Sequence, residues 1–354
     1  MSVPVTIRQI AQKADVSIGT VSHVINGTAA VREKLRVRVL EAIRSLGYQP
    51  SQLARGLRRN QTSILVMIIP DVTNPFFPAV IRGVEDIAFK NKFRLVLCNT
   101  DNDRRKETLY LNEMRSYSPA GWLVIPSADS EIASHFAKMP GPPAVCLDRQ
   151  PQGWDGDVVL VANEAGAYSA TRHLLRMGHR HIAVITGPLH LANAVERLTG
   201  FKRALAEANV PIDADYIQEA RFERNSGYSA AKLLLRMMPR PTAIFACNDL
   251  MALGVLLAAR ELGLHCPEDL SIVGFDNLEF AELTAPALTT VHQPGYQLGT
   301  AAARLLLERI AGSQKPRQKV VLPTELRSRQ SVAPPLGASS AALPNQPLET
   351  AEIG

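Results

Sequence analysis

Side chains suited to hydrogen bonding with a base edge cluster near the amino end of the chain. Ser22, His23 and Asn26 supply a hydroxyl, an imidazole and an amide, and Ile18 and Gly19 lie one turn earlier. Residues three and four apart share one face of a helix, so these five positions form a small outer face. Its size and chemistry fit a DNA major groove, where base edges are read by hydrogen bonds and apolar contacts.

Two short helices joined by a tight turn are predicted to carry this face. Thr6 and Gln9 form a capping box at the start of the first helix, and Ser17 is placed to cap the second. Val21 and Ile25 lie four residues apart and point inward, opposite the outer face. The pattern predicts a helix-turn-helix. The apolar stripe of the first helix comprises Ile7, Ile10, Ala11 and Ala14.

A third helix and the distribution of charge argue against an ordinary helical hairpin. The third helix is expected from about Arg32 to Leu46, with Gly47 as its C-cap. Residues 1–62 hold ten Lys and Arg against three Asp and Glu, a net charge of +7. The rest of the chain holds 29 against 30, a net charge of −1. The positive excess therefore lies at the amino end, as in a module that contacts phosphates. We expect a DNA-binding domain over residues 1–49.

Residues 50–62 form a basic connector. Ser51 could cap a short helix that reaches about Arg58, with Ala54 and Leu57 on one face. A helix of this length does not persist alone in water. We favour a hinge helix that folds only against a partner, and a solvated linker is the alternative.

The bulk properties exclude several classes of protein. A chain of 354 residues with 46% hydrophobic residues is long enough for more than one core. No apolar run approaches the ~20 residues that cross a bilayer, and no apolar signal segment follows Met1. The four cysteines show no metal-binding spacing. We expect no membrane association and a reducing cytoplasm as the location.

From residue 63 onward, short apolar runs alternate with helix-length amphipathic segments, which predicts parallel sheets covered by helices on both faces. A break near residues 160–163 predicts two doubly wound lobes with a cleft between them. The fold class is thus an all-α helix-turn-helix head followed by an α/β core of two doubly wound parallel-sheet lobes. Lobe 1 is expected at about 63–162 and 294–321, lobe 2 at about 163–293 and 322–332, and a disordered tail at 333–354. Strands are expected at 64–69, 93–98, 122–125, 144–147, 181–186, 242–246, 271–275 and 319–322.

Polar and aromatic residues follow several of these strands, at the ends where open α/β sheets bind ligands. Aromatic faces with Asp, Asn and Arg suit a hydroxyl-rich ring. For any single Asp or Asn, capping the next helix is an equally good explanation, but convergence on one cleft favours a ligand. These residues are Asp71, Asn74, Phe76, Phe77, Asp148, Arg149, Arg197, Asn248, Asp249 and Asp276.

Catalytic and nucleotide-binding motifs are missing from the sequence. It contains no G-x-G-x-x-G, phosphate loop, H-E-x-x-H or G-x-S-x-G. His179 and His181 form an H-x-H pair without a third ligand in view. We therefore expect no enzyme activity, no metal and no cofactor.

Several motifs match a known family in order and spacing. They are Val16-Ser-x-x-Thr-Val-Ser22 with Asn26, Leu46-Gly-Tyr-x-Pro50, Ala54-Arg-x-Leu57, Asn74-Pro-Phe-Phe77, Gly178-His-Arg-His-Ile-Ala183, Arg197-x-x-Gly-Phe201, Asn248-Asp-x-Met-Ala-Leu-Gly254 and Gly274-Phe-Asp-Asn277. Over residues 5 to about 332 the chain resembles the lactose-repressor (LacI/GalR) family of bacterial transcription regulators.

The resemblance implies a ligand-responsive transcriptional regulator, usually a repressor, that binds a pseudo-palindromic DNA operator as a homodimer. It implies that Leu57 acts as a wedge in the minor groove. It also implies that the core is periplasmic-binding-protein-like and closes around a small effector between its lobes. The implied DNA-binding residues are Thr6, Ser17, Ile18, Gly19, Thr20, Ser22, His23, Asn26, Tyr48, Ala54, Leu57 and Arg58. The implied effector-binding residues are Asn74, Phe76, Phe77, Asp148, Arg197, Asn248 and Asp276. A carbohydrate or sugar phosphate is the first expectation, and a purine or a phosphocarrier protein as co-effector stays open.

Three positions depart from the family pattern. His23 stands where an arginine is common, and a histidine cannot make the two-pronged contact to guanine that arginine makes. His23 either gives one hydrogen bond to a base or contacts phosphate, and we favour the base. Gly19 offers no side chain at another reading position. Arg32 replaces the usual hydroxyl cap of the third helix, which costs about 1 kcal/mol unless Thr28 or a water substitutes. Operator preference therefore does not carry over from relatives.

Two other classes of protein share such a core. A free-standing sugar-binding or transport protein would need an export signal and no basic head, and this chain has the reverse. A sugar-modifying enzyme would need a phosphate loop or a paired acid and base in the cleft.

Overall fold

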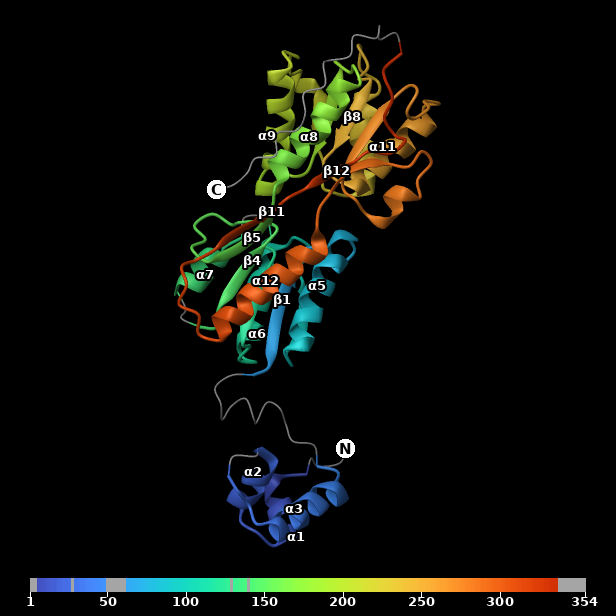
Figure 1. Cartoon of the computed structure of the whole chain (residues 1–354). Coiled ribbons are helices and arrows are strands. Elements are labelled where there is room, and N and C mark those ends of the chain that lie inside the picture. The colour runs from blue at the N-terminus through green and yellow to red at the C-terminus, as the bar shows by residue number, and fades with distance from the viewer. Residues whose placement is uncertain (1–4, 27–28, 49–61, 128–129, 139–140, 337–354) are drawn as a thin grey trace. The chain divides into compact units, whose positions relative to one another are not determined.

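The computed structural model describes residues 5–26, 29–48, 62–127, 130–138 and 141–336. Its contacts divide the chain into two units, Met1–Ser63 and Ile64–Gly354, and each is described by itself (Figure 1). The predicted hinge residues Ala54, Leu57 and Arg58 lie outside the described residues, as does the expected tail from residue 337 onward.

In the described residues of the first unit, three helices have ends that follow from local side-chain chemistry. The Thr6 side chain and Gln9 form the predicted capping box, and the amide of Thr20 donates to Ser17 Oγ at 3.1 Å. Gly47 ends the third helix with φ 63°, a conformation that glycine adopts at little cost. Arg32 precedes that helix without a side-chain cap, as the sequence indicated. The helices are α1 (Ile7–Ala14), α2 (Ile18–Asn26) and α3 (Glu33–Leu46).

A small apolar core holds these helices together. Ile10, Val21 and Val39 come from α1, α2 and α3 and have no exposed surface. Arg38 of α3 donates to the Asp15 carboxylate at 3.0 Å, which ties α3 to the turn between α1 and α2. The predicted helix-turn-helix with a third supporting helix is confirmed.

Lobe 1 of the second unit is built on a wholly parallel sheet with strand order β11-β5-β4-β3-β1-β2. Helix α12 packs on α5 and on the middle strands (Figure 1). The strands are β1 (Ile64–Ile69), β2 (Arg94–Asn99), β3 (Gly121–Val124), β4 (Ala144–Leu147), β5 (Asp157–Val161) and β11 (Lys319–Leu322). The helices are α5 (Phe76–Lys90), α6 (Arg104–Arg115), α7 (Ile132–Lys138) and α12 (Gly295–Ile310).

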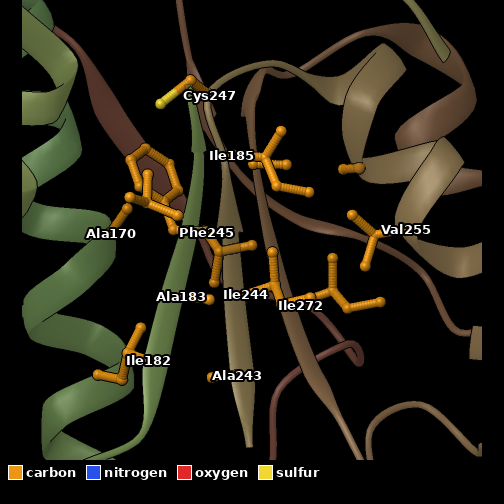
Figure 2. Close-up of a cluster of buried hydrophobic side chains, with 14 of the residues drawn as sticks. Ala170, Ile182, Ala183, Ile185, Ala243, Ile244, Phe245, Cys247, Val255 and Ile272 are labelled. Atoms are coloured by element: carbon orange, nitrogen blue, oxygen red, sulfur yellow. The ribbon is translucent and has the colours of Figure 1, made fainter. Parts of the chain in front are cut away.

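Lobe 2 repeats the plan with the order β12-β10-β9-β8-β6-β7, in which only β12 runs antiparallel to its neighbour. Figure 2 shows its core, where Ala170 of α8 faces Phe245 of β8 and Val255 of α11 faces Ile272 of β9. The strands are β6 (Ile182–Thr186), β7 (Ile217–Glu219), β8 (Ala243–Ala246), β9 (Ser271–Asp276), β10 (Thr289–His292) and β12 (Glu325–Arg327). The helices are α8 (Asn163–Arg176), α9 (Ala192–Glu207), α10 (Arg224–Leu234) and α11 (Asp249–Glu261), with 3-10 turns at Ala214–Tyr216 and Glu279–Glu282.

The chain crosses between the two sheets three times. The crossings lie between β5 and α8, between β10 and α12, and between β11 and β12. Thr324 Oγ1 on the third crossing donates to the Ala162 carbonyl on the first at 3.1 Å. The fold class predicted from the sequence, two doubly wound lobes after a helical head, is confirmed.

The structure corrects the predicted elements in two respects. Strands β5, β7, β10 and β12 were not predicted, because three of them are short and the apolar run of β5 coincides with the break between the lobes. Residue 333 does not begin a disordered tail. The amide of Ala333 donates to Ser271 Oγ at 3.0 Å, and its carbonyl lies 2.9 Å from His179 Nε2. Within the described ranges, no helix is long and apolar enough to cross a membrane.

Candidate functional site

A cavity of about 580 Å³ lies in the second unit at the carboxyl ends of strands from both sheets. Parallel sheets bring these ends to one edge, so that loops from both lobes face the same space. Lobe 1 contributes Asp71, Asn74, Phe77, Asp101, Asn102 and Arg149. Lobe 2 contributes Pro188, His190, Leu191, Glu219, Ala220, Arg221, Phe222 and Glu223.

Phe222 forms the aromatic wall on the lobe 2 side, in the loop between β7 and α10. Its φ of 61° is uncommon for a bulky residue and costs free energy, so the surroundings must hold it. Asn248 Nδ2 donates to the Phe222 carbonyl at 2.9 Å, and the Arg197 guanidinium lies 5.7 Å from the ring centre. Asn248 also caps α11, since its Oδ1 accepts from the Met251 amide at 2.9 Å. The helix cap and the placing of Phe222 are therefore functions of one side chain.

Phe77 forms the aromatic wall on the lobe 1 side, in the first turn of α5. Asn74 accepts from the Phe76 amide at 3.0 Å and from the Phe77 amide, through its carbonyl, at 3.1 Å. Phe76 does not line the cavity. Its buried ring lies edge-on to Phe77 at 5.4 Å and next to Gly295, the first residue of α12.

Arg149 is a buried cation at the floor of the cavity. Its Nη1 donates to the Pro126 carbonyl at 3.0 Å and to Asn102 Oδ1 at 3.2 Å. Its Nε lies 3.4 Å from Asp148 Oδ2 without a hydrogen bond, and burial lowers its pKa. Asn193 Nδ2 of lobe 2 donates to the same Asp148 oxygen at 3.4 Å, so this carboxylate links the lobes.

Arg197 and Asp276 are buried on the far side of Phe222 from the cavity lining, with 2% and 5% of their surface exposed. Arg197 Nη1 is 3.9 Å from Asp276 Oδ1 and donates to the Cys247 carbonyl at 2.5 Å. Its guanidinium also stacks over the Phe275 ring at 3.9 Å. Burial raises the pKa of Asp276 well above its ordinary value, against the opposing effect of Arg197. Asp276 has φ 124°, a second strained residue beside the cavity.

Within the described part of the chain, four buried polar atoms near these strand ends have no hydrogen-bond partner, which is a costly arrangement unless water or a ligand supplies one. They are Arg149 Nε, Thr186 Oγ1, Asn193 Oδ1 and Gln293 Oε1. Both lobes and one crossing contribute to this set. Of these four residues Arg149 alone lines the cavity, so its Nε is the atom placed to meet a polar ligand there.

The structure separates the predicted effector residues into three groups. Asn74 and Phe77 line the cavity. Asp148, Arg197, Asn248 and Asp276 lie in a buried layer that holds the lining, and Phe76 packs against α12. The sequence missed the loop from Glu219 to Glu223, because β7 has only three residues. Asp101 and Asn102 follow the predicted second strand, so the strand-end argument applied consistently would have found them.

The predicted base-reading face lies on α2 in the first unit. Ile18 is 42% exposed, Gly19 and His23 are exposed, and Ser22 is half-buried. Thr20 Oγ1 lies 2.9 Å from Ser17 Oγ, Thr6 is exposed, and Asn26 is the last residue of α2. Tyr48 is half-buried against the helical core. Among the residues with assigned structure, no group of His, Cys, Asp and Glu could hold a metal ion.

Both units of the chain match models of known protein families. The model of bacterial regulatory proteins of the lacI family matches residues 6–51, and that of the periplasmic binding protein-like domain matches residues 171–332. The HTH-type transcriptional repressor PurR of Aliivibrio salmonicida (strain LFI1238) is 39% identical over 328 residues, which cover 92% of this chain and 98% of that protein. The PurR of Vibrio cholerae serotype O1 (strain M66-2) is 38% identical with the same coverage.

Solved structures agree with these relatives. The lac repressor dimer bound to operator and the anti-inducer ONPF is 27% identical with a TM-score of 0.83, over 94% of this chain and 100% of that one. The transcriptional regulator CelR in complex with cellobiose is 31% identical with a TM-score of 0.72, over 92% and 99%. A LacI family regulator from Enterococcus faecium with bound ribose is 35% identical with a TM-score of 0.69, over 77% and 99%.

A helix-turn-helix followed by a two-lobed core with a ligand cleft defines a DNA-binding protein under the control of a small molecule. The chain belongs to the LacI family of bacterial regulatory proteins. It is an effector-controlled transcriptional repressor and not an enzyme, which removes both the transport protein and the sugar-modifying enzyme as alternatives.

Proposed function

We propose that the effector of this repressor is an uncharged sugar bound in the cavity between Phe77 and Phe222. Two aromatic rings from opposite lobes suit the C–H faces of a sugar ring, and the surrounding amide and guanidinium groups suit its hydroxyls. The observation that carries the proposal is the lining itself, in which aromatic rings from opposite lobes stand among polar side chains. Arg149 lines the cavity, and its unpartnered Nε can donate to a sugar hydroxyl.

The charge of the lining favours a neutral sugar over a sugar phosphate. Asp71, Asp101, Glu219 and Glu223 face the cavity against two guanidinium groups. Arg149 is buried and already donates through Nη1 to Pro126 and Asn102, which leaves Arg221 as the exposed guanidinium of the lining. A phosphate would meet more negative than positive charge at this mouth. The cellobiose and ribose in the cited CelR and Enterococcus faecium structures also support a neutral sugar.

On the DNA side we propose that Ile18, Gly19, Ser22 and His23 face base edges, with the other predicted DNA-binding residues placing α2 and the hinge. The chain would act as a homodimer on a pseudo-palindromic operator in the bacterial cytoplasm. Exposed apolar side chains on the second unit support a partner of the same kind. Phe89 is 65% exposed and Leu97 39% exposed on the open edge of lobe 1, and Leu283 is 79% exposed on lobe 2.

The experiment that tests the sugar proposal is a binding screen of the full chain by calorimetry. Neutral monosaccharides and disaccharides are compared with their phosphate esters, using wild type and Phe222→Ala. We expect one neutral sugar to bind at least tenfold more tightly than its phosphate ester, and Phe222→Ala to weaken it. Preference for the phosphate ester would contradict the proposal, as would binding that Phe222→Ala leaves unchanged.

A further inference from the structure

Two of the three crossings are held by buried amides bonded to the charged pair behind the cavity. Asn163 on the first crossing is 1% exposed, and its Oδ1 accepts from Arg197 Nε at 2.9 Å. Gln293 on the second is 4% exposed, and its Nε2 donates to Asp276 Oδ1 at 2.5 Å. Since Arg197 and Asp276 are 3.9 Å apart, one polar network joins lobe 2 to both crossings.

Burying the side-chain amide of Gln293 costs free energy, because its Oε1 has no hydrogen-bond partner among the described residues. An apolar side chain of similar shape would fill the same space without that cost. Its backbone is also fixed at both sides, because its amide donates to the Asp276 carbonyl at 3.3 Å and its carbonyl accepts from the Gly295 amide at 2.8 Å. The backbone of Gln293 is therefore already bonded to Asp276, the last residue of β9, and the side chain adds a second bond to the same residue.

The contacts continue from Gln293 into lobe 1. Gly295 begins α12, and a Cβ on it would lie 3.3 Å from the Phe76 ring. One turn on, a Cβ on Gly299 would come within 2.1 Å of the Val80 carbonyl, so α12 and α5 are in direct backbone contact. Helix α5 carries Phe77 into the cavity. Asp276 on one side of the cleft is thus connected through Gln293 to the helix that bears the opposite wall.

We propose that Gln293 is a positioning residue that sets the relative orientation of the lobes through its bond to Asp276. Asn163 does the same for Arg197 on the first crossing. A ligand that displaces Arg197 or Asp276 then changes the geometry of two crossings at once. The regulatory meaning of this coupling rests on the proposed effector site, but the coupling itself is a property of the ligand-free chain and is tested there.

The test measures the distance between the lobes in the full-length, effector-free chain. Spin labels are attached to cysteines introduced at the exposed positions Asn112 of α6 and Lys202 of α9. Cys98, Cys146 and Cys247 are buried, and the half-buried Cys266 is replaced by serine in all variants so that it takes up no label. Pulsed electron paramagnetic resonance then gives the distribution of interlobe distances.

Gln293→Leu keeps the volume and removes the hydrogen bond to Asp276. We expect the ratio of interlobe populations to change about fivefold, which corresponds to one hydrogen bond of about 1 kcal/mol. Gln293→Asn, whose amide is one methylene too short to reach Asp276, should give the same change and decides the matter should the leucine variant fold poorly. Gln297→Leu, at an exposed position of α12 just after the crossing, is the control. Distributions identical to wild type in both Gln293 variants would overturn the proposal, and so would an equal change in Gln297→Leu.

Discussion

The ring of Phe222 lies directly on the backbone of Gly187, so that a Cβ placed on Gly187 would be 2.0 Å from the ring Cζ. No side chain larger than hydrogen fits there while Phe222 keeps its position. Gly187 follows β6, and Phe222 follows β7, the neighbouring strand. The aromatic wall of the cavity therefore depends on a glycine 35 positions earlier in the chain.

Gly187→Ala is expected to displace the Phe222 ring and to weaken sugar binding about tenfold or more, because a packed aromatic face is worth more than 1 kcal/mol. Calorimetry of the variant checks this. In a Phe222→Ala background the same glycine substitution should cost nothing further, since the clash has been removed. Equal losses in both backgrounds would show that Gly187 acts independently of the ring.

Arg197→Ala is expected to lower the free energy of unfolding by about 3–5 kcal/mol, because it leaves Asp276 and the Cys247 carbonyl buried without their cation. Arg203→Ala in the same helix is the control. Its side chain is 45% exposed in its ion pair with Glu164, so its loss should cost less than about 1 kcal/mol. Urea denaturation gives both values. Similar costs for the two variants would contradict the structural role of Arg197.

The free energy of unfolding is expected to fall below about pH 6.5 because of His179. Burial lowers the pKa of His179 from 6.5 to about 4, so the unfolded chain binds a proton that the folded chain does not between these pH values. Above pH 6.5 the buried, neutral His179 contributes about 3 kcal/mol to the free energy of unfolding. This contribution is lost as the pH falls toward 4.

Thermal unfolding at pH 7 and pH 5 measures this loss in wild type and in His179→Gln. The comparison isolates His179, since other titrating groups, including Asp249 with its pKa raised by burial to about 7, are common to both proteins. The glutamine variant should show the smaller difference between the two pH values, and the exposed His181→Gln should behave as wild type. An unchanged difference in His179→Gln would exclude the linkage.

His23→Arg is expected to change the preferred base at one operator position, because arginine makes a bidentate contact to guanine that histidine cannot make. Selection of bound duplexes from a random pool gives the preference of each protein. A preference identical to wild type would instead assign His23 to the phosphate backbone.

Leu57→Ala is expected to weaken operator binding far more than binding to random DNA, because a minor-groove wedge acts only where the duplex is kinked. Anisotropy titrations at one salt concentration provide both affinities. Equal losses on the two DNAs would refute the wedge.

The fold was predictable from sequence where local chemistry decides it. The Thr6–Gln9 capping box, the Gly47 C-cap and the apolar strand runs each depend on residues close in the chain, and all appear in the structure. Strand β7 escaped because three residues carry too little periodicity to recognise. Ala333 escaped because its partners, Ser271 and His179, are 62 and 154 residues away.

The cavity was predictable in location but not in detail. The strand-end rule located Asn74 and Phe77, since the turn that follows a strand is a local feature. The other polar residues line the cavity only where no other side chain covers them in the folded chain, and that is not a local feature of the sequence. Arg197 and Asp276 have the composition of ligand contacts, yet they lie behind Phe222, and Phe222 itself is positioned by the glycine at 187.

The most direct test measures operator affinity of the full chain with and without the neutral sugar that binds best. The operator is taken from selected genomic fragments, and wild type is compared with Phe222→Ala. The account predicts that the sugar changes operator affinity of wild type by about tenfold or more, a coupling of 1–3 kcal/mol, and has little effect on Phe222→Ala. A sugar that binds the cavity without altering operator affinity would contradict it, as would an equal response in both proteins.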